Sequence, residues 1–414
     1  MKDFLFKKVG NTSKYVARDF IFAGIISLLL VLTIRFFTNT TPPIHDAVYY
    51  VQMAQYGIIG TDNLAAPFIY RFATPMIVRG ISALFTITID NGFGIIAFVS
   101  ALSLLFLTFL FTRNLGYNYL ASMTSTGVIA FSFYHCKYSL FFPTMIDIEA
   151  YVLFLIALWM LIKRRFILCV LVSAIGVLFK EFLLIPPALM IIVLIIEFRS
   201  SRSSRQLMLI IYTIFFVGIF FILPRLLIPI KKGLDFQDIH HFPETVRLKM
   251  MLQKPFNLYK DINILFSWFS YWLPTLILST PERTNYAWIK LKDMRSVLII
   301  YLLLVLIFTM YGGENISIFV TYSFVAQIIL IATFVEYGIT TWEILYLFGA
   351  LIIFNRIFSH VPLPRDDFYG YADFYGGWSS LVTMQTLYRF IELYGYFVVI
   401  VLIRKILNLR KLRK

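Results

Sequence analysis

Apolar stretches of about 20 residues, separated by short runs rich in Lys and Arg, recur along most of this chain. A stretch of that length is what an α-helix needs to cross the hydrocarbon core of a bilayer. The sequence therefore predicts an all-α, polytopic transmembrane protein. We expect about 12 spans, at roughly 20–38, 91–112, 117–135, 149–162, 166–180, 182–198, 207–229, 262–280, 297–311, 316–335, 341–357 and 387–404.

The composition excludes the soluble alternatives. Of the 414 residues, 60% are apolar and 14% are charged, whereas soluble domains carry roughly 25% charged residues. The chain has two cysteines and no low-complexity tract. These features exclude a soluble globular domain, a disordered chain, a disulfide scaffold and a nucleic-acid-binding arm, so we expect no nucleic acid partner.

The positions of Lys and Arg predict the orientation of the spans, because these residues are retained in cytoplasmic loops. If the basic cluster before residue 19 is cytoplasmic, alternate gaps between spans should also be basic, and nearly all of them are. These loops then carry the whole formal net charge of +15, and the opposite side sums to zero. We expect both termini in the cytoplasm, and a multi-pass protein of a bacterial inner membrane, or of the endoplasmic reticulum in a eukaryote.

Three long loops, 39–90, 231–261 and 358–386, fall on the external side of this topology. In the first of them, the spacing after Pro42-Pro43 places Ala47, Tyr50, Met53 and Ala54 on one face of a helix. Asp46 stands at the start of that helix, where an acid complements the helix dipole. A second helix, over 76–85, spans about 15 Å and is too short to cross the bilayer. The first helix is predicted to lie along the interface, and the second to lie in the interface or to form a re-entrant segment.

Two short motifs in this loop carry a resemblance to a known family. They are Asp46-Ala47-x-x-Tyr50-x-x-x-Ala54 and Pro67-Phe68-x-Tyr70-Arg71-x-x-x-Pro75. The chain resembles the membrane-embedded glycosyltransferases of the GT-C fold, which include the dolichyl-phosphate-mannose protein mannosyltransferases and the bacterial aminoarabinose lipid A transferases. Asp147 in the next external loop and Lys180 in Phe179-Lys180-Glu181 match further positions of the family, and the resemblance covers about 200 residues.

The resemblance implies a GT-C-like catalytic core over 1–200 and a C-terminal transmembrane region over 201–414. It also implies sugar transfer, on the extracytoplasmic side and with inversion, from a polyprenyl-phosphate-linked donor to a lipid, glycan or protein acceptor, among membrane lipids. Asp46 would be the general base, with Asp147 as the second catalytic acid. Where the family often has two adjacent acids, this chain has His45-Asp46. No cofactor is therefore assigned, and a divalent cation stays an open alternative.

The departing lipid phosphate of such a reaction requires cations. The candidates for binding the phosphate or the substrate lie at the external side or its boundary, and they are Arg71, Arg79, Lys137, Lys180, Glu181 and Arg389. Glu181 is included as the neighbour of Lys180, because an ion pair at membrane depth indicates function. The simpler interpretations are snorkelling cations, a structural Lys180–Glu181 salt bridge and an N-cap role for Asp46.

Sugars are bound by aromatic rings that stack on their apolar faces and by carboxylates that accept from their hydroxyls. The candidates for sugar contact are His45, Tyr50, Asp366, Asp367, Tyr369 and Trp378. An aromatic belt at the membrane interface explains the run from 365 to 378 equally well. Asp235, Asp238, His240 and His241 cluster in the second external loop without a recognised ligand spacing, so the metal ligands stay unassigned.

Two other functional classes fit the same topology. Twelve spans with both ends inside are common in secondary transporters, in which Asp147 or the Lys180–Glu181 pair would be a coupling relay. A lipid-linked polysaccharide polymerase or ligase would place its main external loop late in the chain, as the loop at 358–386 does. Transporters bury their key charges near the midplane of the bilayer, whereas the acids of this chain gather on one side.

Overall fold

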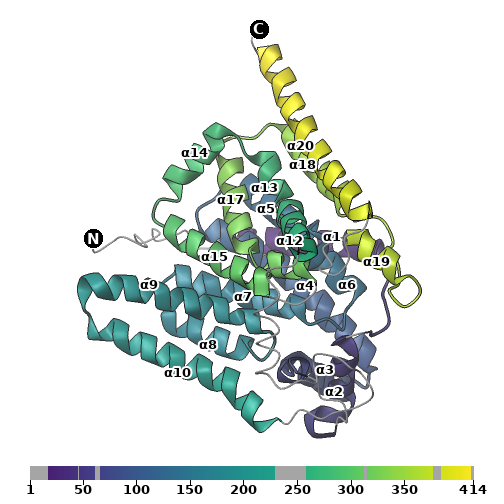
Figure 1. Ribbon diagram of the computed structural model, residues 1–414, viewed down its shortest axis with the longest axis vertical. Coiled ribbons are helices and arrows are strands. Elements are labelled where there is room, and N and C mark those ends of the chain that lie inside the picture. The colour runs from purple at the N-terminus through teal and green to yellow at the C-terminus, as the bar shows by residue number, and fades with distance from the viewer. Residues whose placement is uncertain are drawn as a thin grey trace.

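The fold is helical throughout the part of the chain that the computed structural model describes, and no β-strand occurs there (Figure 1). The described residues are 17–44, 46–60, 66–228, 258–311, 315–375 and 384–411. The sequence-based expectation of an all-α protein is therefore confirmed for these ranges.

Most of the helices in the N-terminal half are shorter than a membrane span. They are α1 (Ala17–Phe36), α2 (Asp46–Gly60), η1 (Phe68–Tyr70), α3 (Ala73–Phe85), α4 (Ile89–Asn114), α5 (Tyr119–Ala130), η2 (Phe133–Lys137), α6 (Tyr138–Phe141), α7 (Asp147–Ile162), α8 (Phe166–Gly176), η3 (Glu181–Leu184) and α9 (Ile185–Ser201). The C-terminal half contains α10 (Ser204–Leu227), α12 (Leu258–Tyr271), α13 (Leu273–Leu278), α14 (Pro281–Lys290), α15 (Arg295–Tyr311), α16 (Ile316–Thr321), α17 (Phe324–Tyr337), α18 (Thr341–Phe354), α19 (Phe368–Tyr375) and α20 (Met384–Lys411).

Local sequence explains where several of these helices begin. The side chains of Thr88 and Asn118 accept hydrogen bonds from backbone N–H groups in the first turns of α4 and α5, which satisfies donors that a helix start leaves without a partner. Thr340 and Glu343 form a capping box at the start of α18. The diproline after Ile185 lies in the first turn of α9. Proline is tolerated there because the first N–H groups of a helix make no intrahelical bond, so this diproline begins a helix rather than interrupting one.

Four helical segments of the described residues are long and apolar enough to cross a membrane. They are Ala17–Phe36, Ile89–Asn114, Glu181–Arg199 and Ser204–Leu227. The pair α14 and α15 adds a fifth if it forms one span, although it bends by 108° at the break between its helices. Four shorter apolar helices accompany them: Ala73–Phe85, Phe166–Gly176, Phe324–Tyr337 and Thr341–Phe354. By length and composition, the described residues thus contain four to five spans of a helical membrane protein.

Helix length and apolar composition alone do not give the expected number of about 12 spans. That number stays a prediction. The α-helix in the predicted span at 117–135 ends at Ala130, and a π-helical turn, η2, follows from Phe133. The predicted span at 166–180 ends at Gly176, and Lys180 after it is extended (φ −162°, ψ 145°). Apolar runs in this chain therefore continue past the ends of their helices.

The core is built around α4, which packs against α1, α5 and α7, while α7 packs against α8 and α17 packs against α5 and α14. One continuous cluster of buried apolar side chains runs from Val31 to Ile400 and joins both halves of the chain. By contrast, only 11% of the apolar window of α10 is buried, compared with 44% for α4. The outer face of α10 is thus apolar and uncovered, as lipid contact requires.

The first loop folds as the sequence predicts. Helix α2 begins at Asp46, and the predicted face of Ala47, Tyr50, Met53 and Ala54 is buried. This face contributes to a separate small core, in which Phe68, Tyr70 and Val78 pack with residues of α2. Helix α3 begins at Ala73, slightly before the predicted start at 76, and ends at Phe85 as expected. Figure 1 shows α2 and α3 side by side at one end of the molecule, where α3 also packs on α4.

Candidate functional site

A cluster of charged side chains gathers where α2, η1, α7, η3 and α10 meet. Arg71, which follows η1, donates from Nε to Glu181 Oε2 at 2.8 Å and from Nη1 to the Tyr50 hydroxyl at 3.2 Å. Arg225 near the end of α10 lies 3.5 Å from the other oxygen of Glu181 and 3.6 Å from the centre of the Phe221 ring. Glu181 therefore pairs with two arginines that come from distant parts of the chain.

Asp147 and Lys180 form the second ion pair of this cluster. Asp147 begins α7 and is 1% exposed, and Lys180 Nζ donates to its Oδ1. The extended backbone of Lys180 between α8 and η3 brings the ammonium to the carboxylate. The other oxygen, Oδ2, is buried and makes no hydrogen bond. One acceptor of Asp147 is therefore left over for a ligand or a proton.

Glu149 is buried two residues beyond Asp147, and both carboxylates act on each other electrostatically. Neither Glu149 oxygen has a side-chain hydrogen-bond donor among the described residues. The structure thus places a second buried acid beside the Asp147–Lys180 pair. Sequence analysis did not select Glu149, because residues two apart on a helix point away from each other.

Asp46 and Tyr50 lie one helical turn apart on α2, so they share a face. Asp46 is partly exposed and acts electrostatically on Tyr50, as do Arg71 and Glu181. Burial raises the pKa of Tyr50, so the hydroxyl stays neutral and accepts the bond from Arg71. Asp46 therefore stands beside the cluster, at the end where α2 begins.

Aromatic side chains form one side of the cluster. Tyr322, after α16, is buried and lies in the electrostatic field of Asp147, Arg71 and Glu181. Its ring stacks on Phe182 with the ring centres 3.9 Å apart and the planes inclined by 14°. Sequence analysis did not find Tyr322, nor Arg225, because neither lies in a motif near the residues that it contacts.

The structure brings together six of the predicted site residues: Asp46, Tyr50, Arg71, Asp147, Lys180 and Glu181. Arg79 is not among them. It donates at 2.6 Å to the carbonyl of Gln55 in α2, where Gly57 (φ 77°) breaks the helix. Lys137 lies in η2, is fully buried, and donates to the carbonyls of Arg356, Ile357 and Ser359. These contacts give Arg79 and Lys137 structural roles, and their predicted phosphate contacts stay untested.

The predicted sugar-contacting residues of the third loop do not reach the cluster through any contact that the structure describes. Asp367 accepts a hydrogen bond at 2.7 Å from the backbone N–H of Gly370 in α19. Asp366 and Tyr369 have exposed side chains. His45 and Trp378 lie outside the described residues, as do Asp235, Asp238, His240 and His241. Within the described ranges no group of three or more His, Cys, Asp or Glu side chains could hold a metal ion.

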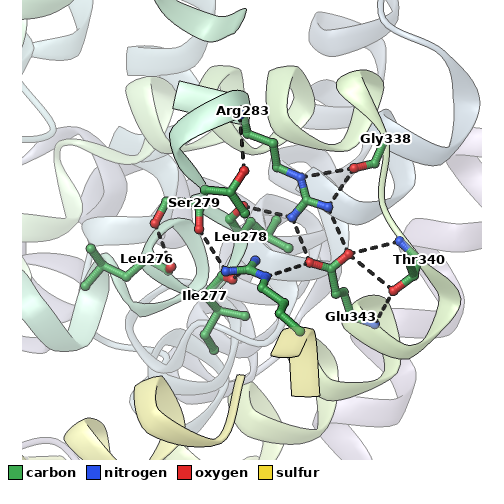
Figure 2. A network of polar contacts seen from close by, with 10 residues as sticks. Leu276, Ile277, Leu278, Ser279, Arg283, Gly338, Thr340 and Glu343 are labelled. Atoms are coloured by element: carbon green, nitrogen blue, oxygen red, sulfur yellow. Dashed lines mark hydrogen bonds and ion pairs between the residues drawn. The ribbon is translucent and has the colours of Figure 1, made fainter. Parts of the chain in front are cut away.

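A second buried charge network lies where α13, α14, α18 and α20 meet (Figure 2). Arg283 donates to both oxygens of Glu343, at 2.9 and 2.8 Å, and to the carbonyls of Leu278 and Gly338. Arg404 donates to Glu343 at 2.9 Å and also to the carbonyls of Ile277 and Ser279. Glu343 also accepts from Thr340 in the capping box. All of these charged groups are used in holding helices together.

Comparison with known proteins adds no assignment. No model of a known protein family, no curated protein and no solved structure matches this chain.

Proposed function

We propose that this chain is a membrane glycosyltransferase that moves a sugar from a polyprenyl-phosphate-linked donor to an acceptor on the extracytoplasmic side. The proposal includes a GT-C-like fold of about 12 spans with both termini in the cytoplasm. The observation that favours it most is the convergence of Asp46, Tyr50, Arg71, Asp147, Lys180 and Glu181, because these residues come from separate segments and were selected from the sequence for one reaction.

Each side chain has a distinct part in the proposed reaction. Asp46 takes the proton of the acceptor hydroxyl while the acceptor oxygen attacks the anomeric carbon. The bond from that carbon to the phosphate oxygen breaks with inversion, and the prenyl phosphate leaves. Asp147, held by Lys180, accepts a hydrogen bond from a substrate hydroxyl through its second oxygen. Arg71 and Arg225 surround Glu181 and give this part of the cluster an excess of positive charge, which favours the departing phosphate.

Substitution of the proposed base tests this function. The purified protein in lipid nanodiscs is incubated with a panel of prenyl-phosphate sugars and acceptors, and the products are identified by mass spectrometry. We expect Asp46→Asn to abolish transfer while the protein inserts and unfolds like the parent. Asp90→Asn is the matched control, because Asp90 is an exposed acid in the first turn of α4, at the end of the same loop. A fully active Asp46→Asn protein would overturn the assignment.

A proton-coupled secondary transporter is the second candidate, and the pair of buried acids Asp147 and Glu149 beside Lys180 favours it. Buried ionisable groups in membrane proteins frequently form proton relays. Proteoliposomes with an imposed pH gradient separate the two classes. Gradient-driven solute uptake without any sugar transfer supports the transporter, and transfer that is independent of the gradient supports the enzyme.

A further inference from the structure

Arg389 differs from the other four cations that were predicted to bind phosphate. Arg71 and Lys180 each hold a carboxylate, and Arg79 and Lys137 donate to backbone carbonyls. Arg389 lies in α20 and is 3% exposed, but its Nε and Nη1 make no hydrogen bond in the described structure. A buried guanidinium with N–H groups left over is costly unless a ligand or water fills its bonds.

Arg389 lines a cavity of about 30 Å³. One buried water needs roughly 10–15 Å³ by this measure, so the space holds about two waters or the oxygens of a small anion. Two other polar side chains of the wall donate to backbone carbonyls. Gln327 donates to the Tyr271 carbonyl at 2.6 Å, and Asn355 donates to the Phe131 carbonyl at 2.8 Å. One donor of each amide is thereby used, whereas Nε and Nη1 of Arg389, in the same wall, make no hydrogen bond.

The surroundings of Arg389 leave positive charge at the cavity. The charged side chains that act most strongly on it are Arg356 and Glu392. Glu392 is one turn further along α20, at 3.5 Å from Arg389 Nη1, and its side chain is about one-third exposed. Arg356 donates to the Phe374 carbonyl at 2.8 Å. The guanidinium of Arg389 lies 4.2 Å from the centre of the Phe354 ring, which fixes the guanidinium by a cation–π contact. Two arginines thus face one partly solvated carboxylate.

We propose that this cavity is a binding site for the phosphate of a phosphorylated ligand, separate from the Asp46–Asp147 cluster. A buried guanidinium whose Nε and Nη1 make no hydrogen bond has donors and a positive charge to offer phosphate oxygens. Tyr134 belongs to the cavity wall, and its ring centre lies 5.8 Å from that of Tyr138, which is within electrostatic range of Asp147. The ligand is assigned as an acceptor that carries its own phosphate, and this assignment rests on the proposed function.

Binding of phosphate is measured without reference to catalysis. Unfolding temperature is recorded for the full chain in detergent against increasing inorganic phosphate or glycerol 3-phosphate. It is also recorded in phosphatidylcholine nanodiscs with and without phosphatidic acid. A ligand that binds the folded state raises the unfolding temperature, and the rise grows with the logarithm of the ligand concentration relative to its dissociation constant. We expect stabilisation of the parent, and an apparent dissociation constant at least ~10-fold higher in Arg389→Gln.

Two further variants keep the result interpretable. Arg389→Lys retains the charge without the fork and should bind with intermediate affinity. Glu392→Gln removes the carboxylate that competes for Nη1 and should bind phosphate more tightly than the parent. Stabilisation by the soluble phosphates identifies a soluble ligand, and stabilisation by phosphatidic acid alone identifies a lipid headgroup. Equal phosphate affinity in the parent and Arg389→Gln, or no stabilisation by any of these probes, overturns the site. Transfer by the parent that Asp46→Asn abolishes would still leave the proposed function standing, so the two failures are distinguishable.

Discussion

The network around Glu343 and the cluster around Asp147 are both buried groups of opposite charges, but they differ in how completely they are bonded. Both oxygens of Glu343 accept bonds from arginines, and these arginines also donate to carbonyls. At the other centre, Asp147 has one oxygen without a bond, and neither oxygen of Glu149 has a side-chain donor. Burial of charge is common to both centres. Incomplete bonding is what distinguishes the candidate functional site from the structural one.

The difference has an energetic consequence. A buried charge that is paired and fully hydrogen-bonded contributes to the fold mainly by the penalty of disrupting it. A buried acid without donors costs stability in the resting protein, and such a cost is retained where function needs the group. Substitutions at the Glu343 network should therefore act on folding, and substitutions at the Asp147 cluster should act on activity more than on folding.

The largest expected loss of stability follows Glu343→Gln. The change leaves Arg283 and Arg404 without a carboxylate, and loss of one partner from a buried network costs about 3–5 kcal/mol. Denaturant unfolding of the purified protein in micelles measures this free energy. Glu336→Gln is the control, because the Lys290–Glu336 pair is more than a quarter exposed on both sides, and it should cost under ~1 kcal/mol. Similar costs for the two variants would contradict the structural role of the network.

A smaller loss is expected for the Asp147–Lys180 pair. Asp147→Asn and Lys180→Met should each lower the free energy of unfolding by about 2 kcal/mol, the range of a hydrogen bond between charged groups. The double variant should lose less than the sum, because it leaves no unpaired charge. All three should lose sugar transfer. A double variant that recovers both stability and transfer would make the pair structural, like the Glu343 network.

The two arginines of Glu181 should differ in their effects. Arg71 donates at 2.8 Å and also bonds Tyr50, whereas Arg225 lies at 3.5 Å. We expect Arg71→Gln to cost about 1–2 kcal/mol, and Arg225→Gln about half as much. Unfolding in micelles measures both, and the parent with either arginine replaced by Lys is the control for charge. The reverse order would show that Arg225 is the main partner of Glu181.

Local pattern was enough to predict much of the first loop. The start of α2 at Asp46 and its buried face follow from spacing, prolines and charge within a few residues. These features depend on periodicity and backbone preferences that a short window contains. The membrane-protein class followed from composition in the same way.

Contacts between residues far apart in the sequence could not be predicted from such a short window. Lys137 donates to carbonyls some 220 residues away, so its structural role could not be read from its neighbours. Arg225 reaches Glu181 across 44 residues. Helix ends such as Ala130 and Gly176 fall inside apolar runs, where composition gives no stop signal and tertiary packing decides. The number of spans was for this reason the least predictable part of the fold.

The smallest effect on stability, and the one that separates the two centres most sharply, is expected at Glu149. A neutral amide avoids the desolvation cost of a buried carboxylate and removes its repulsion with Asp147, so Glu149→Gln should leave the free energy of unfolding unchanged or raise it by about 1 kcal/mol. Sugar transfer should fall, by about 10²-fold if Glu149 exchanges a proton with the substrate. The same Glu→Gln change at 343 is the matched comparison, since it should destabilise the protein without a specific effect on turnover per folded molecule. A loss of stability in Glu149→Gln as large as that in Glu343→Gln would contradict this prediction. It would mean that Glu149 is hydrogen-bonded as fully as Glu343, and incomplete bonding would then no longer distinguish a functional centre from a structural one.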